Sequence, residues 1–330
     1  MQSRDHNQRS AQTSAQPEEL DTPDHAHERP QGSVAVILGS AFSRRPPRDM
    51  SLAERLVSTP WGEVTVHEVI DARSDRPAYL LFRHGLPHQV YPQQVNFRAQ
   101  ACALKSLHCQ ALLITSSVGV LDVNVPLDTP LLMGDLLMPD HRLPDGSLCT
   151  LLTSSPHQRG DHTRDDSSPD PSLPMALRPG HLVWRGSVSS PLLDTQVSSL
   201  AERAGASVWG SVTFAYVAGP RTKTPAENQY WASLGAQVNS MSVGPEVVLA
   251  SELEIPTVTL MIGHKRSGGA QRRREQDVSA QPKPQYEDHR EMTATLDRSH
   301  QVLERIVRGF VQSAQPVAFP HYIYRYHSDL

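Results

Sequence analysis

The sequence predicts an α/β protein built on a largely parallel, twisted mixed sheet with helices on both faces. Three observations predict this fold: short apolar runs recur along the chain, segments with helical periodicity lie between them, and small, polar or charged residues follow most of the runs at once. Near-continuous apolar runs of about four to eight residues are typical of strands that are buried on both faces. Strands that alternate with helices favour a parallel sheet between two helix layers.

The apolar runs define the expected strands. They are SVAVIL at 33–38, PAYLLF at 77–82, ALLIT at 111–115, SVTFAYVA at 211–218 and TVTLMI at 257–262. Open α/β sheets bind their ligands beyond the carboxyl ends of such strands. The residues that follow each run are therefore the first candidates for a functional site.

Four further segments have the spacing of amphipathic helices. They span 97–107, 225–235, 245–253 and 291–311. With 38% hydrophobic residues in a chain of 330, the sequence can bury one substantial core. We expect a single domain over 33–330.

Three polar segments interrupt this pattern. Residues 1–32 are rich in Gln, Ser, Asp, Glu and Pro and contain almost nothing to bury, which is typical of a disordered tail. The segments near 157–174 and 268–289 have a similar composition, and we expect them to be polar loop insertions within the domain.

Charge and cysteine content exclude several classes of function. The 31 basic and 35 acidic residues nearly balance, so the composition does not indicate nucleic acid or a membrane as a partner. Cys102, Cys109 and Cys149 are the three cysteines and have no Cys-x-x-Cys spacing, which argues against disulfides and a cysteine metal site. No stretch approaches the roughly 20 apolar residues of a membrane helix, and no signal peptide is recognisable. We expect a cytoplasmic protein without a bound metal.

The residues that follow the expected strands have the chemistry of an anion site. They are Gly39, Ser40, Arg83, His84, Ser116, Ser117, Gly119, Gly219, Arg221, Lys223, Met241, Ser242, His264, Lys265 and Arg266. Hydroxyls, an Arg-His pair and flexible glycine backbone suit an oxyanion such as phosphate. The chain has no G-x-S-x-G, Walker, G-x-G-x-x-G or H-E-x-x-H motif. A hydrolase triad of Ser40, His84 and an Asp is an alternative, although nothing in the sequence orders these residues.

The stretch RHGLPHQVYPQQVNFRAQACALKSL, residues 83–107, resembles the trimeric nucleoside phosphorylases, most closely the methylthioadenosine, methylthioinosine and purine nucleoside enzymes. Six more motifs agree with the family's order: VILGS, TPWG, TSSVGVL, GDLLMPD, GPRTKTPAE and MSVGPEVVLASEL. The resemblance implies a homotrimeric enzyme with inorganic phosphate as co-substrate and no cofactor. Phosphate would attack C1′ of a nucleoside or 5′-methylthio nucleoside, giving free base and a ribose 1-phosphate through an oxocarbenium-like transition state.

The resemblance also implies roles for residues of the phosphate half of the site. The implied phosphate ligands are Ser40, Arg83, His84, Ser116, Ser117 and Ser242. Met241 is implied to pack on the ribose. Ala41 replaces a glycine of the family's first loop, and a methyl group there would weaken phosphate binding if the position needs a positive φ. Arg44, Arg45 and Arg48 follow this loop and could compensate, or could belong to a solvated loop.

The base half departs further from the family. Thr222 and Lys223 stand where the family has an aromatic or aliphatic residue followed by Glu or Ser. Lys265 stands where purine enzymes carry Asn or Asp, and Ser267 replaces a second Asp of adenine-reading enzymes. Lysine only donates hydrogen bonds, so it cannot accept one from the 6-amino group of adenine. With His264 nearby, the residues indicate a base-binding end that favours an acceptor-rich or anionic base.

A second hypothesis belongs to another class of function. If the two lysines point into solvent, the chain is an inactive homologue that binds a phosphate-bearing ligand or a protein partner through the inherited crevice. The residues alone do not choose between this hypothesis and a phosphorylase with altered base specificity.

Overall fold

The computed structural model describes residues 32–42, 46–72, 74–152, 180–267 and 289–325. All of them belong to one compact unit, Gln31–Leu330. Apart from its last residue, the expected tail lies outside the described residues. So do Arg44, Arg45, the whole of the expected insertion near 157–174 and all but the last residue of the one near 268–289.

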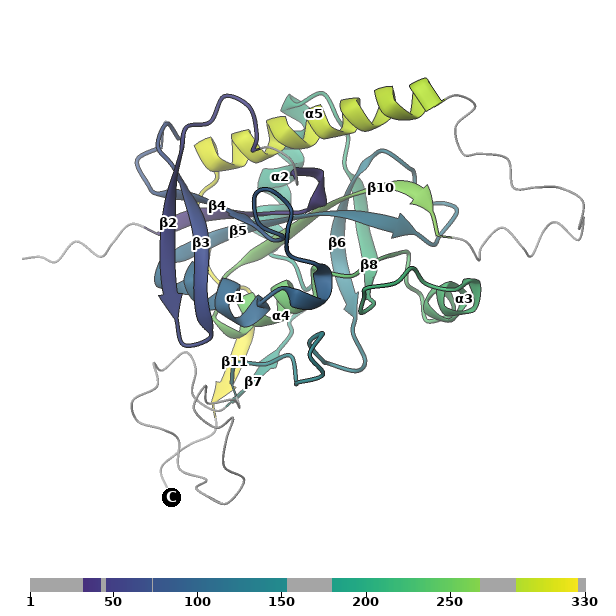
Figure 1. Ribbon diagram of the computed structural model, residues 1–330, viewed down its shortest axis with the longest axis horizontal. Helices are drawn as coiled ribbons and strands as arrows, with labels where there is room; N and C mark the ends of the chain where they lie inside the picture. The colour runs from purple at the N-terminus through teal and green to yellow at the C-terminus, as the bar shows by residue number, and fades with distance from the viewer. Residues whose placement is uncertain (1–31, 43–45, 73, 153–179, 268–288, 326–330) are drawn as a thin grey trace, which may run out of the picture. The chain divides into compact units, whose positions relative to one another are not determined.

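A mixed sheet of nine strands forms the centre of the described chain (Figure 1). The strands are β1 (Ser33–Leu38), β2 (Leu52–Thr59), β3 (Gly62–Val69), β4 (Ala78–Phe82), β5 (Cys109–Val120), β6 (Pro130–Leu137), β8 (Trp209–Tyr216), β9 (Val238–Ser240) and β10 (Thr257–Arg266). Their order is β10-β6-β8-β9-β5-β1-β4-β3-β2. β10 also pairs with β5, so β5, β10, β6, β8 and β9 close into a ring.

The strand pairs at the centre of the sheet are mostly parallel. β1 runs parallel to β4 and β5, β5 runs parallel to β10, and β8 runs parallel to β6 and β9. The pairs β2–β3, β3–β4, β5–β9 and β6–β10 are antiparallel. The prediction of a largely parallel mixed sheet is confirmed.

Helices cover both faces of this sheet (Figure 1). α1 (Phe97–Ser106) and α4 (Gly244–Glu252) cover one face, α2 (Pro191–Arg203) and α5 (His289–Ser313) cover the other, and α3 (Pro225–Ser233) lies to one side. Successive side chains of a strand point to opposite faces. In β1, Ala35 and Ile37 join a core that α1 and α4 cover, whereas Val34, Val36 and Leu38 join a core that α2 and α5 cover. The two-sided burial explains why the run SVAVIL is apolar throughout.

The structure extends two of the predicted strands. The expected strand 111–115 continues as β5 to Val120, and the expected strand 257–262 continues as β10 to Arg266. Their parallel register runs from Thr257 opposite Leu112 to Arg266 opposite Val120. These polar ends therefore lie on strands instead of on loops after them, because ladder hydrogen bonds to the neighbouring strand hold them extended.

Several elements have no counterpart among the predicted ones. The hairpin of β2 and β3 exposes most side chains of β2, so it lacks an apolar run, and its turn at TPWG needs Gly62 at φ 118°. Also unpredicted are β6, β9, α2, the short 3-10 helices Ser40–Phe42 and Pro92–Gln94, and the separate pair of β7 (Gly180–Val183) with β11 (Tyr322–Arg325).

Candidate active site

A cavity of about 500 Å³ is lined by β5, β9 and β10 and by the segments that follow β1, β4 and β8. The predicted site residues that line it are Ser40, Arg83, His84, Ser116, Ser117, Thr222, Lys223, Met241, Ser242, His264, Lys265 and Ser267. The structure thus brings together all twelve residues to which the resemblance gave a phosphate, ribose or base role, whereas Gly39, Gly219 and Arg221 are not among the residues that line the cavity. They come from segments up to about two hundred residues apart, which the closed ring of strands gathers at one place.

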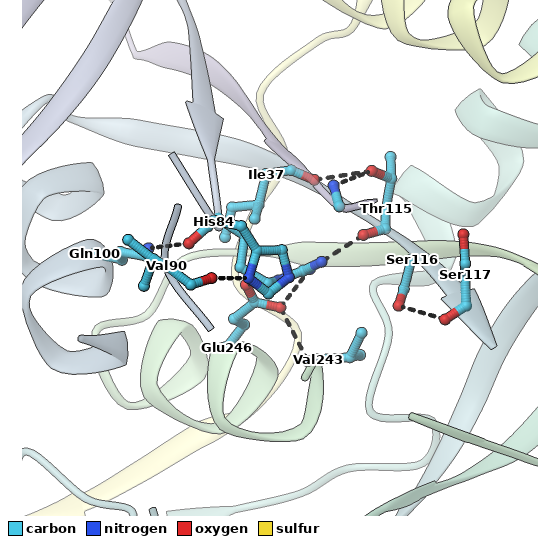
Figure 2. A network of polar contacts seen from close by, with 11 residues as sticks. Ile37, His84, Val90, Gln100, Thr115, Ser116, Ser117, Val243 and Glu246 are labelled. Carbon is cyan, nitrogen blue, oxygen red and sulfur yellow. Dashed lines mark hydrogen bonds and ion pairs between the residues drawn. The ribbon is translucent and has the colours of Figure 1, made fainter. Parts of the chain in front are cut away.

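Arg83 is the most deeply buried charge in the cavity wall, with 1% of its surface exposed. Its Nε donates to Glu246 Oε1 at 2.6 Å and its Nη2 donates to Glu246 Oε2 at 2.7 Å (Figure 2). Nη2 also donates to the carbonyl oxygen of Thr115 at 3.1 Å. This bidentate pair fixes the guanidinium plane at the start of α4. A rigid buried arginine is suited to binding an oxyanion.

His84 follows Arg83 and is held in one tautomer. Its Nδ1 lies 2.9 Å from the carbonyl oxygen of Val90, which can only accept, so Nδ1 carries the hydrogen (Figure 2). Burial first, and then the positive charge of Arg83, lower the pKa of His84 to about 4. The ring, which stacks on His88 with centroids 4.5 Å apart, is therefore neutral at pH 7. Gln100 of α1 donates to the carbonyl oxygen of Arg83 at 3.2 Å and ties the pair to that helix.

The glycine loop after β1 approaches Arg83 closely. The N–H of Gly39 donates to Thr115 Oγ1 at 3.0 Å. A Cβ on Gly39 would lie 2.7 Å from the carbonyl oxygen of Thr115 and 2.8 Å from Nη1 of Arg83, so only glycine fits there. The exposed Ser40 stands at the cavity edge, where its hydroxyl can reach a ligand.

The concern about Ala41 does not apply to this backbone. Ala41 lies in the 3-10 helix Ser40–Phe42, it is absent from the described residues with positive φ, and its methyl group packs against the core under α2 and α5. Arg48 does not compensate in the described geometry, because its exposed side chain is not part of the cavity wall and its backbone N–H donates to Glu304.

Two serine positions complete the anion half. Ser116 on β5 is 6% exposed, and its hydroxyl donates to the carbonyl oxygen of Ser117 at 3.2 Å, a bond that a rotation of the hydroxyl can exchange for a ligand. Ser242 is 5% exposed and precedes Val243, whose φ of 74° is unusual for a β-branched residue. The N–H of Val243 donates to Glu246 Oε2 at 3.1 Å. Glu246 therefore holds both Arg83 and the strained backbone beside Ser242.

Met241 also lines the cavity. It is half-buried, and a Cβ on Gly219 would lie 2.7 Å from its sulfur. This packing against bare glycine backbone fixes the thioether at the cavity wall. A flexible apolar side chain there offers a surface for the carbon face of a sugar.

The other half of the cavity is cationic. Lys223 is half-buried directly before α3, and Thr224 caps that helix by accepting from the N–H of Glu227 while Glu227 accepts from the N–H of Thr224. Burial first, and then the charge of Lys265, lower the pKa of Lys223 to about 8. Lys265 is exposed at the same cavity. Both lysines line the cavity, a point that the sequence had left open.

A β-bulge explains why neighbouring residues of β10 line the same cavity. Gly263 pairs with Val118 and Lys265 pairs with Gly119, so His264 is an extra residue without an opposite partner in the ladder. His264 Nδ1 lies 2.7 Å from Asp128 Oδ1. Beyond the bulge, Ser267 closes the wall, and its Oγ would lie 2.1 Å from a Cβ on Gly119.

Some cavity residues did not emerge from the sequence. Asn239 and Asn228 form a buried amide pair in the base half, with Asn239 Nδ2 donating to Asn228 Oδ1 at 3.2 Å. His88 and Pro92 line the anion side. A buried asparagine within a strand, here Asn239 in the middle of β9, is a signal that could have marked the first pair.

Other kinds of site were sought among the described residues. No group of three or more His, Cys, Asp or Glu side chains there is placed to hold a metal ion. None of the described helices is both long and apolar enough to cross a bilayer. The three cysteines are unpaired and buried, and burial raises the pKa of Cys102 to about 11 and of Cys109 to about 12, so they are poor nucleophiles.

Comparison with known proteins agrees with this geometry. Residues 33–312 match the family model of the phosphorylase superfamily. The chain is 30% identical over 243 residues to the probable S-methyl-5′-thioinosine phosphorylase of Methanopyrus kandleri, covering 73% of this chain and 81% of that protein. It is 27% identical over 234 residues to the 6-oxopurine nucleoside phosphorylase of Pyrococcus furiosus, covering 69% and 77%.

Solved structures share the fold. A variant of adenosine/methylthioadenosine phosphorylase from Schistosoma mansoni, in complex with adenine, superposes with a TM-score of 0.64 at 18% identity, over 85% of this chain and 90% of that one. The predicted resemblance is confirmed by both kinds of comparison. The chain belongs to the phosphorylase superfamily, and the prediction that it is a nucleoside phosphorylase enzyme is confirmed.

Proposed function

We propose that the protein catalyses phosphorolysis of a purine-type nucleoside, or of its 5′-methylthio relative, and that its base is not adenine. The products are the free base and ribose 1-phosphate or its 5-modified form. One observation carries the proposal: a single cavity unites the anion half around Arg83 with a base half that presents lysines and no carboxylate among the described wall residues. The relatives include proteins named for thioinosine and 6-oxopurine substrates and others named for methylthioadenosine, so the proposed preference for a 6-carbonyl base rests on the cavity residues.

The anion half suits the attacking phosphate. Arg83 supplies a guanidinium group that Glu246 holds in place, and the hydroxyls of Ser40, Ser116 and Ser242 supply donors around it. The neutral ring of His84 adds a polar contact without a second full charge. A phosphate held in this way is positioned to attack C1′. We expect this positioning to be the main contribution of the anion half to the rate.

The base half suits a departing group that gains negative charge. When the bond from C1′ to the base breaks, its electron pair goes to the base while the sugar becomes oxocarbenium-like. Ammonium groups at Lys223 and Lys265 lower the energy of that charge. Both groups only donate hydrogen bonds, which disfavours the 6-amino group of adenine and favours carbonyl oxygens. The inactive-homologue hypothesis is not favoured, because both halves of the cavity retain ligand-binding chemistry.

The remaining features of the proposal are inferred from the family to which the chain belongs. We propose a homotrimer in the cytoplasm that needs phosphate as co-substrate and no cofactor. Sedimentation or light scattering of the purified chain tests the trimer, and turnover after treatment with a chelator tests the independence from metals. A monomer with full activity, or activity that a chelator removes, would contradict these parts.

A panel of nucleosides tests the central proposal. The purified protein is incubated with phosphate and adenosine, inosine, guanosine, xanthosine or their 5′-methylthio forms, and released base is measured by chromatography. We expect release of base from oxo-purine nucleosides and little from adenosine. In Lys265→Asn we expect the preference to shift towards inosine. Release of no base from any member, or preference for adenosine, refutes the proposal.

A further inference from the structure

We propose that Lys223 and Lys265 together form a binding site for a purine base with carbonyl oxygens at both positions 2 and 6, bound as an anion at neutral pH. This inference rests on the proposed function and names the substrate class of the same cavity. Such a 2,6-dioxopurine presents acceptors and negative charge where a 6-aminopurine presents a donor.

The first observation is that no hydrogen bond or ion pair holds either of these two cations within the described part of the chain. Neither Lys223 nor Lys265 has a hydrogen bond or an ion pair with any residue that the structure describes. Neighbouring cations are satisfied: Arg83 binds Glu246, and Arg221 binds Glu227 at 2.6 Å. Arg266 donates to the carbonyl oxygens of Asp122 and Val125 at 2.7 and 2.8 Å. Two ammonium groups that no described residue pairs therefore line the same cavity, one half-buried and one exposed.

The second observation is the unfavourable environment of Lys223. Its ammonium is half-buried and faces the charge of Lys265, and both effects lower its pKa. The carboxylate of Glu227 opposes this shift, but it is already engaged by Arg221 and by the N–H of Thr224. A buried charge without a counter-ion destabilises a protein. An anionic ligand between the two lysines would supply the missing counter-charge.

The third observation is the distance from the phosphate half. Ser116 lies in the anion half, and Lys265 pairs with Gly119, three residues further along β5. At the rise of an extended strand this separation is about 10 Å. In a displacement at C1′ the leaving group lies opposite the attacking phosphate oxygen, so a group held beyond the sugar at this end is the base. Asn239 and Ser267 add polar contacts around it.

The reaction balances with this charge state. An oxygen of hydrogen phosphate forms the new bond to C1′, the bond from C1′ to the base nitrogen breaks, and its electron pair goes to the base. The proton of hydrogen phosphate ends on the departing base, directly or by way of water. A base that entered as an anion leaves as an anion, and the two ammonium groups stabilise the additional charge that it carries before this proton arrives.

The experiment compares xanthosine with inosine, which differ at position 2 and in charge near neutral pH. We expect kcat/KM of the wild-type enzyme to be higher for xanthosine, and Lys223→Met to lower that value by about tenfold or more while changing inosine less. Arg203→Met is the matched control, because it removes one exposed positive charge from the last turn of α2, outside the cavity. Equal loss for both nucleosides in Lys223→Met, or preference for inosine in the wild type, overturns the inference.

Calorimetry separates this inference from the proposed function. Xanthine and hypoxanthine are titrated into the wild-type protein with phosphate present, which requires neither turnover nor a variant. Tighter binding of xanthine supports the lysine site even if no nucleoside is cleaved, in which case only the proposed reaction fails. Cleavage of inosine with equal or weaker binding of xanthine overturns the lysine site and leaves the phosphorylase proposal intact.

Discussion

Glu246 holds Arg83 through two hydrogen bonds of 2.6 and 2.7 Å, and only 1% of either side chain is exposed. The pair joins the end of β4 to the first turn of α4, and the same carboxylate accepts from the N–H of Val243 beside Ser242 (Figure 2). One buried glutamate therefore orders two residues of the anion half without lining the cavity itself.

Glu246→Gln should weaken phosphate binding more than nucleoside binding. The variant removes the negative charge that orients the guanidinium, and a lost charge-assisted hydrogen bond corresponds to an increase of about tenfold to a hundredfold in the KM for phosphate. Steady-state kinetics with each substrate varied in turn measures this split. Glu252→Gln is a matched control, because it neutralises another buried glutamate of α4 that is not part of this cavity.

The conservative variant Glu246→Asp distinguishes a positioning role of Glu246 from a general loss of structure. It keeps the charge one methylene further away, so it should give a smaller rise in the KM for phosphate. If Glu246→Gln folds and keeps the wild-type KM for phosphate, the positioning role is wrong.

Gly39→Ala should damage the anion half by steric overlap. The new Cβ would lie 2.7 Å from the backbone oxygen of Thr115, which cannot move aside as a flexible side chain can, and 2.8 Å from Arg83 Nη1. Overpacking of this kind typically costs about 1–3 kcal/mol. Calorimetric titration with phosphate should show weaker binding or none. Gly210→Ala is the control, because no atom lies within 4 Å of its Cβ position and its φ is not positive; equal phosphate affinity in both variants would refute the overlap argument.

The rate with the preferred nucleoside should fall above pH 8. Lys223 has a pKa of about 8, so its ammonium is present below that pH and is lost as pH rises through it. Hydrogen phosphate keeps its charge over this range, and Lys265 and Glu227 are the charged groups that act on Lys223. The pH profile of kcat/KM should therefore lose up to about tenfold per unit on its alkaline side. In Lys223→Met, kcat/KM should no longer fall with pH on the alkaline side. An unchanged profile in the variant would show that another group causes the fall.

Glu252 should make the fold less stable as pH rises. Burial raises its pKa from 4.5 to about 7, against opposing hydrogen bonds from the N–H of Leu151 and the hydroxyl of Thr150. The folded state keeps the proton between these two pH values while the unfolded state loses it. The stabilisation present below pH 4.5 is thus lost by pH 7, an effect of about 3 kcal/mol.

Denaturant unfolding of the wild type and Glu252→Gln from pH 4 to 8 measures this contribution. The amide can still accept a hydrogen bond and does not ionise, so the stability of the variant relative to the wild type should increase over that range. A difference that is independent of pH would show that Glu252 ionises in the folded state as it does in the unfolded one.

The sequence predicted β1, β4, β5, β8 and β10 of the core and twelve residues of the site, but not β6, β9 or α2. SVAVIL became β1 without change, and the helix expected at 97–107 became α1 at Phe97–Ser106, because burial on both faces and helical periodicity are local patterns. All twelve predicted site residues line one cavity, since strand ends of a parallel sheet meet at one edge.

Only the tertiary structure decided how these residues act. The pair of Arg83 and Glu246 joins positions 163 residues apart, and the bulge at His264 exists because β10 must match the register of β5. The backbone also shows that Ala41 fits a 3-10 helix. From the sequence, Ala41 was expected to weaken phosphate binding if its position needed a positive φ. Whether Lys223 meets a counter-ion likewise depends on what packs around it. Such facts depend on contacts between distant segments, and the linear pattern, which predicted the strand ends, does not specify which side chains pair across them or where a strand bulges.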